Sequence, residues 1–263
     1  PMRRREDGTF ERVTWDEAIG DISSRLREII DKNGPNAFAP YIGNPTAFNT
    51  LAGPAIGALF AQIGTKRMFS SGTQDCANKF AGSEAVFGSS TMHPVPDLDH
   101  TELFLSFGAN PRVSHASFLS ISDPIRVIKS VVARGGRVVH VNPRRIESDK
   151  TKAGDTLLIR PDTDVYLLAA LIHEIDRGAG FDAAVVKTHG KHVEELRAFV
   201  ANYPAERVAG VTGIDADEIR ALALDFANAK AASVHMSTGV NMGRQGTLAY
   251  WLLPMLSLSR IPI

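Results

Sequence analysis

The apolar positions along the chain follow two patterns, one typical of helices and one typical of buried strands. The order of these patterns predicts an α/β protein. Between residues 15 and 30, apolar side chains recur every three or four positions, which is the spacing of an amphipathic helix. Thr14 and Glu17 form the capping-box pair that starts such a helix, and Asn33-Gly34 ends it. Residues 103–107 (LFLSF) instead form an apolar run rich in Phe and Leu, which is typical of a strand buried on both faces of a parallel sheet.

Further short apolar runs predict strands at residues 37–41, 137–141, 156–159 and 233–236. Asp123-Pro124 is an N-cap followed by proline, which opens a helix between two of these strands. Strand, helix and strand over residues 103–141 therefore form a βαβ unit, for which we expect a right-handed crossover. Residues 52–63 are apolar nearly all round, which predicts a buried helix.

Composition narrows the class of protein. The chain has 263 residues, 44% hydrophobic and 22% charged, enough to bury one large core or two modest ones. The formal net charge is zero, so charge offers no support for a nucleic-acid partner. The single cysteine, Cys76, excludes an internal disulfide or a cysteine-ligated cluster built by this chain alone. No run approaches the roughly 18 apolar residues of a membrane span, so we expect none in this chain.

Candidate chemistry lies where the predicted strands end. Glycine lets a backbone approach a ligand closely, Asn and Asp can bond to a base or ribose, and Arg suits phosphate. Five such loops occur, at Gly43-Asn44, Gly108-Ala-Asn110 with Pro111, Asn142-Pro143-Arg144, Asp162-Thr-Asp164 and Gly239-Val-Asn241. Each one alone is an ordinary turn sequence. Together they predict a nucleotide-bearing cofactor spread over several loops, although the common Gly-x-Gly-x-x-Gly and P-loop fingerprints are absent.

The chain resembles the molybdopterin-guanine-dinucleotide oxidoreductases of the dimethyl sulfoxide reductase family. The resemblance rests on an ordered set of motifs, namely residues 10–18 (FERVTWDEA), 41–45 (YIGNP), 97–102 (DLDHTE), 108–111 (GANP), 141–145 (VNPRR), 159–164 (IRPDTD) and 211–214 (VTGI). It covers essentially the whole chain, and the set is far more specific than any one motif.

The resemblance implies an α/β fold with two doubly wound domains whose sheets are mostly parallel. One dinucleotide-binding domain would span residues 73–231, and residues 1–72 and 232–263 would come together as the other. The cofactors implied are two molybdopterin guanine dinucleotides and molybdenum or tungsten. An iron-sulfur cluster is expected only in a region preceding Pro1, so these residues would be the central part of a longer catalytic subunit, inactive alone.

The resemblance also assigns roles to individual residues. Gly108 and Asn110 match a loop that passes the dinucleotide phosphates and ribose. Asn142, Pro143 and Arg144 stand at the family's Asp-Pro-Arg position, with Asn replacing the charged Asp. Asp164 matches a carboxylate that accepts hydrogen bonds from the guanine edge. Asp162 occupies a position that is Gly in the family. Gly239 matches a loop glycine near the metal-side pterin.

The metal ligand implied by the resemblance comes from the loop at residues 73–76. A thiolate is a soft ligand that suits molybdenum, so we expect Cys76 to bind the metal. The spacing from Cys76 to Gly88 is one residue short for a cysteine-type member, which keeps Asp75 as the alternative. A lone cysteine can also be a small buried hydrophobe.

The implied activity is two-electron redox chemistry or oxygen-atom transfer on a small substrate, with an electron-transfer subunit or domain as partner. Two other interpretations stay open. One is a metal-free structural relative, such as the large iron-sulfur subunit of NADH dehydrogenase, and the other is an unrelated nucleotide-binding α/β module. The compartment also stays open between the cytoplasm, which we favour, and the periplasm.

Overall fold

The computed structural model describes residues 1–43, 46, 49–115 and 119–259. These residues divide into two compact units, Pro1–Thr73 and Gln74–Ile263, and each unit is described by itself.

The first unit contains short strands and two longer helices. Its elements are β1 (Met2–Arg4), β2 (Phe10–Arg12), α1 (Trp15–Asn33), the 3-10 helix η1 (Pro35–Ala37), β3 (Tyr41–Ile42), α2 (Ala52–Ile63) and β4 (Phe69–Ser70), while α3 (Gly72–Asp75) crosses into the second unit. Strands β1 and β2 pair antiparallel, and β3 and β4 pair parallel. The predicted capping box of α1 is confirmed, since the Thr14 hydroxyl accepts from the Glu17 N–H at 3.2 Å.

The first unit has no interior of its own. None of its described residues is buried, and Trp15 and Ile22 on the apolar face of α1 are 70% and 62% exposed. The predicted helix at residues 52–63 is confirmed as α2, but the expectation that it is buried is wrong, because each of its residues is exposed or half-buried. The strand expected at residues 37–41 is also shorter and later, because Pro35 starts the 3-10 helix η1 instead.

The second unit is built on a parallel sheet, and the predicted α/β class is confirmed. Its strands are β5 (Leu103–Phe107), β6 (Arg137–Asn142), β7 (Asp155–Leu158) and β8 (Ala232–Met236), in the order β7-β6-β5-β8. All three pairings are parallel, with Leu105 of β5 opposite Val139 of β6 and Val234 of β8. Each of the five residues of β5 is buried, as the run rich in Phe and Leu predicted.

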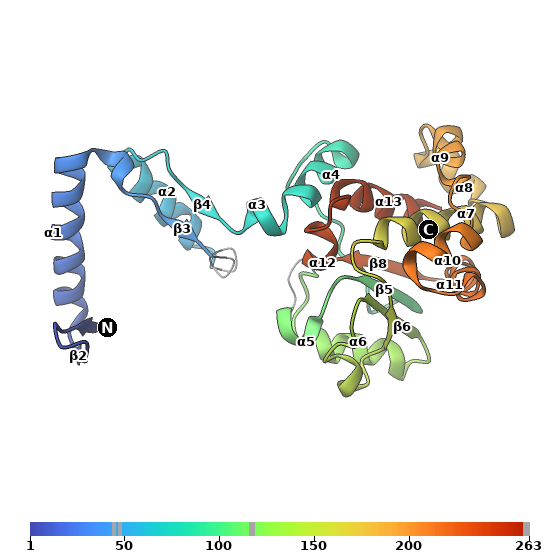
Figure 1. Cartoon of the computed structure of the whole chain (residues 1–263), viewed down its shortest axis with the longest axis horizontal. Helices are drawn as coiled ribbons and strands as arrows, with labels where there is room; N and C mark the ends of the chain where they lie inside the picture. Colours follow the sequence, from blue (N-terminus) through green and yellow to red (C-terminus); the bar gives the residue numbers. More distant parts are fainter. Residues whose placement is uncertain (44–45, 47–48, 116–118, 260–263) are drawn as a thin grey trace. The chain divides into compact units, whose positions relative to one another are not determined.

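Helices cover both faces of this sheet (Figure 1). The helices of this unit are α4 (Ala77–Phe87), α5 (Pro111–Ser114), α6 (Pro124–Ala133), α7 (Asp164–Gly178), α8 (Ala183–His189), α9 (Val193–Val200), α10 (Ala205–Thr212), α11 (Ala216–Asn228), α12 (Thr238–Asn241) and α13 (Gly246–Leu258), with the 3-10 helix η3 (Asp149–Thr151). Because strand side chains alternate between faces, Leu105 and Phe107 join the large core of α7, α11 and α13, whereas Phe104 packs with α6. No helix among the described residues is long and apolar enough to cross a membrane.

The C-terminal segment of the chain packs on the central strand of the second unit. Strand β8 hydrogen-bonds to β5, and α13 contributes Leu252 and Leu256 to the large core. Pairing with the central strand β5 therefore holds this segment in the unit of residues 74–231.

Candidate functional site

Four of the five predicted loops meet at one edge of the second unit's sheet. The four strands are parallel, so their carboxyl ends share an edge, and the loops at residues 108–111, 142–144, 162–164 and 239–241 follow β5, β6, β7 and β8 there. The fifth predicted loop belongs to the first unit, where Gly43 lies just after β3, and Asn44 lies outside the described residues.

Gly108 and Gly239 bring the loops after β5 and β8 into backbone contact. The Gly239 N–H donates to the Gly108 carbonyl at 3.1 Å, and Gly108 has a φ of +57°. A Cβ on Gly108 would lie 2.7 Å from the Val240 nitrogen, and one on Gly239 would lie 2.7 Å from the Gly108 oxygen. No side chain fits between these loops, so both positions require glycine.

Asn142 ties the loop after β6 to the loop after β5. Its Nδ2 donates to the Ala109 carbonyl at 3.0 Å, and the residue is 8% exposed. An ionised aspartate could not donate this bond. The departure from the family's Asp therefore has a structural role here, while the neighbouring Pro143 is exposed.

Glu147, which the sequence did not single out, holds the two polar residues expected at the phosphates. Its carboxylate accepts from the Asn110 amide and pairs with Arg144, whose Nη2 lies 3.1 Å from Oε2. The pKa of Glu147 is lowered to about 2, first by the Arg144 bond and then by the Asn110 bond. The Glu147 carboxylate thus accepts from the donors that a phosphate would use. In the sequence, the only signal for this contact was an acidic residue three positions after Arg144.

The loop after β7 is hydrogen-bonded to the segment just before α13. Asp162 has a φ of +65° and accepts two bonds from Arg244, from its backbone N–H at 2.9 Å and its Nε at 2.6 Å. A Cβ on Gly243 would meet the same carboxylate at 2.7 Å. Asp162 therefore joins the loop after β7 to the connection between α12 and α13. The positive φ at Asp162 is a conformation that favours glycine, which is the residue that the resemblance implied at this position.

Asp164 is a buried carboxyl group at the first position of α7. It is 8% exposed, and its pKa is raised to about 6, chiefly because burial disfavours the charged form and secondarily because of the charge of Asp162. It lines a small cavity together with Val240 and Gly246. A ligand that offers N–H donors there would replace the hydration that the carboxylate has lost.

Asn78 brings the candidate metal ligands to the same edge. Its Nδ2 donates to the Asn241 carbonyl at 2.6 Å, and its Oδ1 accepts from the Thr247 hydroxyl at 2.8 Å. Because Asn78 lies two residues after Cys76, these bonds hold the start of α4 against the loop after β8. Sequence reasoning missed Asn78, because its partners are more than 160 residues away in the chain.

The two candidate metal ligands differ in exposure. Cys76 is 7% exposed, and its pKa is raised by burial first and by the charge of Asp75 second, while Lys79 acts in the opposite direction. Asp75, at the end of α3, is half-buried. A thiol binds metal as the thiolate, so Cys76 in this setting would have to lose its proton when it binds one.

Unpaired polar atoms at this edge fit a polar ligand. Both amide atoms of Asn241 and the Oδ1 of Asn110 are buried and have no hydrogen-bond partner among the described residues. Such atoms are rare in folded proteins because each costs free energy unless a partner arrives. Together with the glycine contact and Asp164, they form a strand-end crevice of the kind that binds nucleotides in α/β proteins.

The second unit has a parallel sheet covered by helices and a polar crevice at the carboxyl ends of its strands. This arrangement is typical of dinucleotide-binding α/β folds. Within this class the chain belongs to the molybdopterin oxidoreductase family, whose model matches residues 1–257. It is 30% identical to formate dehydrogenase H of Escherichia coli over 255 residues, covering 93% of this chain and 33% of that protein.

More distant relatives agree with this assignment. The chain is 25% identical to dimethyl sulfoxide reductase DmsA of Haemophilus influenzae over 291 residues, covering 98% of this chain and 36% of that protein. The solved acetylene hydratase of Pelobacter acetylenicus has a similar fold, with a TM-score of 0.70 at 24% identity, over 97% of this chain and 34% of that one. The predicted resemblance is thus confirmed, and it excludes the unrelated nucleotide-binding module. The chain spans about a third of the length of these relatives.

Proposed function

We propose that these residues hold a molybdopterin guanine dinucleotide as part of a molybdenum or tungsten oxidoreductase. The observation that carries the proposal is that four strand-end loops, predicted separately along the sequence, are tied together at one sheet edge. The buried polar atoms without partners at that edge support a ligand with many hydrogen-bonding groups. The cofactor would supply two-electron redox chemistry or oxygen-atom transfer on a small substrate.

The protein's own residues would bind and orient the cofactor. Gly108 and Gly239 let it approach the backbone, and Asn110 and Arg144 would turn from Glu147 to the phosphates. Asp164 would accept from the guanine edge, because a buried carboxylate gains most from a partner that donates N–H groups. The complete enzyme would also contain a second dinucleotide and an electron-transfer subunit or domain.

Cys76 is the proposed metal ligand, and Asp75 is the alternative. The bonds of Asn78 hold the start of α4, and therefore Cys76, next to the loop after β8. The thiolate is the softer of the two ligands and the better match to molybdenum. Burial around the thiol also excludes water from the atom that would bind the metal.

The test is metal and nucleotide analysis of the protein purified from a host that synthesises the cofactor. We expect molybdenum or tungsten by mass spectrometry and GMP after acid hydrolysis. Cys76→Ser should lower the metal content at least tenfold, whereas Asp75→Asn should leave it within about twofold. The reverse order would assign the metal to Asp75. Absence of both metal and GMP would favour the metal-free structural relative and reject the proposal.

A further inference from the structure

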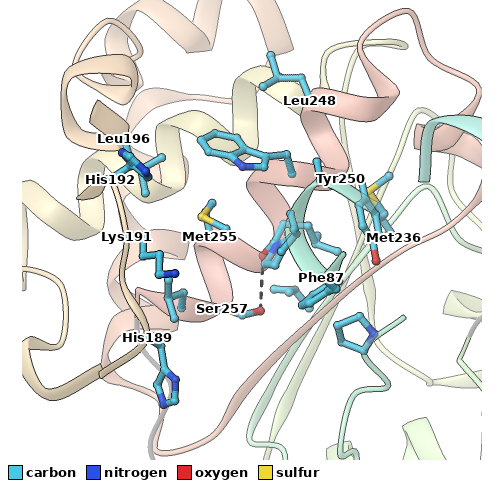
Figure 2. Close-up of a pocket in the computed structure, with 18 of the residues that line it drawn as sticks. Phe87, His189, Lys191, His192, Leu196, Met236, Leu248, Tyr250, Met255 and Ser257 are labelled. Atoms are coloured by element: carbon cyan, nitrogen blue, oxygen red, sulfur yellow. Dashed lines mark hydrogen bonds between the residues drawn. The ribbon is translucent and has the colours of Figure 1, made fainter. Parts of the chain in front are cut away.

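A cavity of about 930 Å³ lies in the second unit beside β8, the strand at the end of the sheet. It is bordered by α4, α13 and the segment that joins α8 to α9, and none of the loop residues assigned to the cofactor lines it. In Figure 2, His189, Lys191 and His192 lie on one side, Phe87 and Met236 lie on the other, and Leu248, Met255 and Ser257 come from α13. The volume is within the range of small-molecule sites, about 300–1,000 Å³.

The walls of the cavity are mostly apolar. Phe87, Leu248, Trp251 and Met255 contribute large side chains from α4 and α13. Trp251 also meets the ring of Phe199 at 6.4 Å in an edge-to-face contact, which fixes the position of the indole. A ligand in this cavity would therefore need an apolar body.

Two buried polar side chains also line the cavity, Lys79 from α4 and His235 from β8. Lys79 is 3% exposed, and its amine lies 5.9 Å from the centre of the Tyr250 ring. His235 on β8 is 4% exposed, and its Nε2 has no hydrogen-bond partner among the described residues. Burial lowers the pKa of Lys79 to about 8, so the amine still carries its charge at neutral pH. Burial also lowers the pKa of His235 to about 3, so the imidazole there is neutral.

The charges that line the cavity favour an anion. Lys79 and Lys191 are cations, whereas Glu195 is the one carboxylate among the described lining residues. The carboxylate of Glu195 is engaged by His192 at 3.0 Å on the exposed rim. An ammonium group has three N–H donors, so Lys79 can donate to an anion that enters the cavity.

We propose that this cavity binds a small amphipathic carboxylate, with its head group at Lys79 and His235 and its apolar chain against Trp251 and Met255. Lys79 would pair with the carboxylate, and the Nε2–H of His235 would donate to it, which gives the orphaned nitrogen a partner. The site is separate from the proposed cofactor crevice, and it does not depend on the cofactor being bound.

The probe is dodecanoate, and the signal is the fluorescence of Trp251 in a Trp15→Phe background, which leaves one tryptophan in the chain. We expect saturable binding below the critical micelle concentration, at least tenfold tighter than binding of dodecyltrimethylammonium. Lys79→Met should weaken dodecanoate binding at least tenfold. The matched control Lys66→Met, which removes an exposed lysine of the first unit, should leave binding within twofold.

A second measurement needs no variant at Lys79. In carbon-13 NMR of carboxyl-labelled dodecanoate, a head group beside an ammonium should titrate below the free acid, whereas an apolar site without a cation would raise its pKa. A raised pKa, equal affinity for both amphiphiles, or unchanged binding in Lys79→Met would overturn the proposal. Loss of the signal through concentration-dependent self-association would also overturn it, since a second copy would then cover the cavity.

Discussion

At the scale of single residues, the contact between Gly108 and Gly239 decides how the candidate crevice is shaped. A methyl group on Gly108 would collide with backbone atoms, which move less easily than the end of a flexible side chain. The same position also has a positive φ, which costs an L-residue about 1–2 kcal/mol. The lack of space and the positive φ therefore both disfavour any side chain at position 108.

Gly108→Ala should lower the free energy of unfolding by about 2–4 kcal/mol, from the collision and the backbone strain together. Gly88 is a matched control, because it has a φ of +72° and nothing within 4 Å of the added methyl group. Gly88→Ala should cost only about 1 kcal/mol, from strain alone. Urea denaturation of both variants measures the difference, and equal losses would show that the close approach of the two loops carries no cost.

Asp164 should make the protein less stable at neutral pH than at acid pH. Its pKa of about 6 in the folded protein exceeds the ordinary value of 3.8, so the folded chain holds a proton that the unfolded chain has lost. The stabilisation is complete below pH 3.8 and is lost as the pH rises through 6. The difference between the two pKa values corresponds to about 3 kcal/mol.

Asp164→Asn mimics the protonated carboxyl group at every pH. Without cofactor, we expect this variant to be more stable than the wild type by about 2–3 kcal/mol at pH 8 and nearly equal at pH 4. Asp99→Asn, at an exposed site, is the control and should change little at either pH. Urea denaturation at both values checks this. A constant difference between pH 4 and pH 8 would contradict the prediction, and a simultaneous loss of GMP would support the role in guanine binding.

At the scale of elements, the loops after strands were predictable but the contacts between them were not. The apolar runs and their Gly-Asn-Pro or Pro-Arg ends are local patterns, and strand ends in a parallel sheet share an edge as a matter of geometry. The bonds from Asn78 to Asn241 and from Asp162 to Arg244 join segments more than 80 residues apart, and no local pattern reports them. Helices α8, α9 and α10 were missed for a different reason, since each is only seven or eight residues long and offers a short pattern.

Asn78→Leu should destabilise the junction between α4 and the loop after β8. The Asn241 carbonyl and the Thr247 hydroxyl would lose their partner, which costs about 1–3 kcal/mol for buried groups. The Asn202 side chain lies on the surface just after α9 and donates to the carbonyls of Ala198 and Phe199, so Asn202→Leu should cost less than about 0.5 kcal/mol. Thermal unfolding followed by circular dichroism compares the two. If Cys76 binds the metal, Asn78→Leu should also lower metal content, whereas Asn202→Leu should not.

At the scale of the whole molecule, the two units differ in how much interior they have. The second unit buries β5 completely, whereas no described residue of the first unit is buried. Helix stability in proteins comes mainly from packing of the apolar face, and the exposed apolar face of α1 lacks such packing within its own unit. Local stability should therefore be very unequal along the chain.

Hydrogen exchange measures that inequality directly. In this 263-residue chain, we expect the amides of α1 and α2 to exchange at least a hundredfold faster than those of β5 and β6, because local opening exposes no buried surface there. Mass spectrometry of peptic fragments from residues 15–33 and 103–107 provides the comparison. Equal protection in the two fragments would show that the first unit is covered in solution.

The sequence by itself determined the α/β class, the positions of the strands β5, β6, β7 and β8, the capped start of α1 and the family. These features depend on short-range patterns of apolar residues, caps and glycines, which any reader of the chain can see. Only the tertiary structure decided that residues 232–258 belong with β5, that Glu147 holds Asn110 and Arg144, and that a cavity lies beside β8. Those features depend on which distant segments pack together. That packing depends on contacts throughout the core and not on any local pattern.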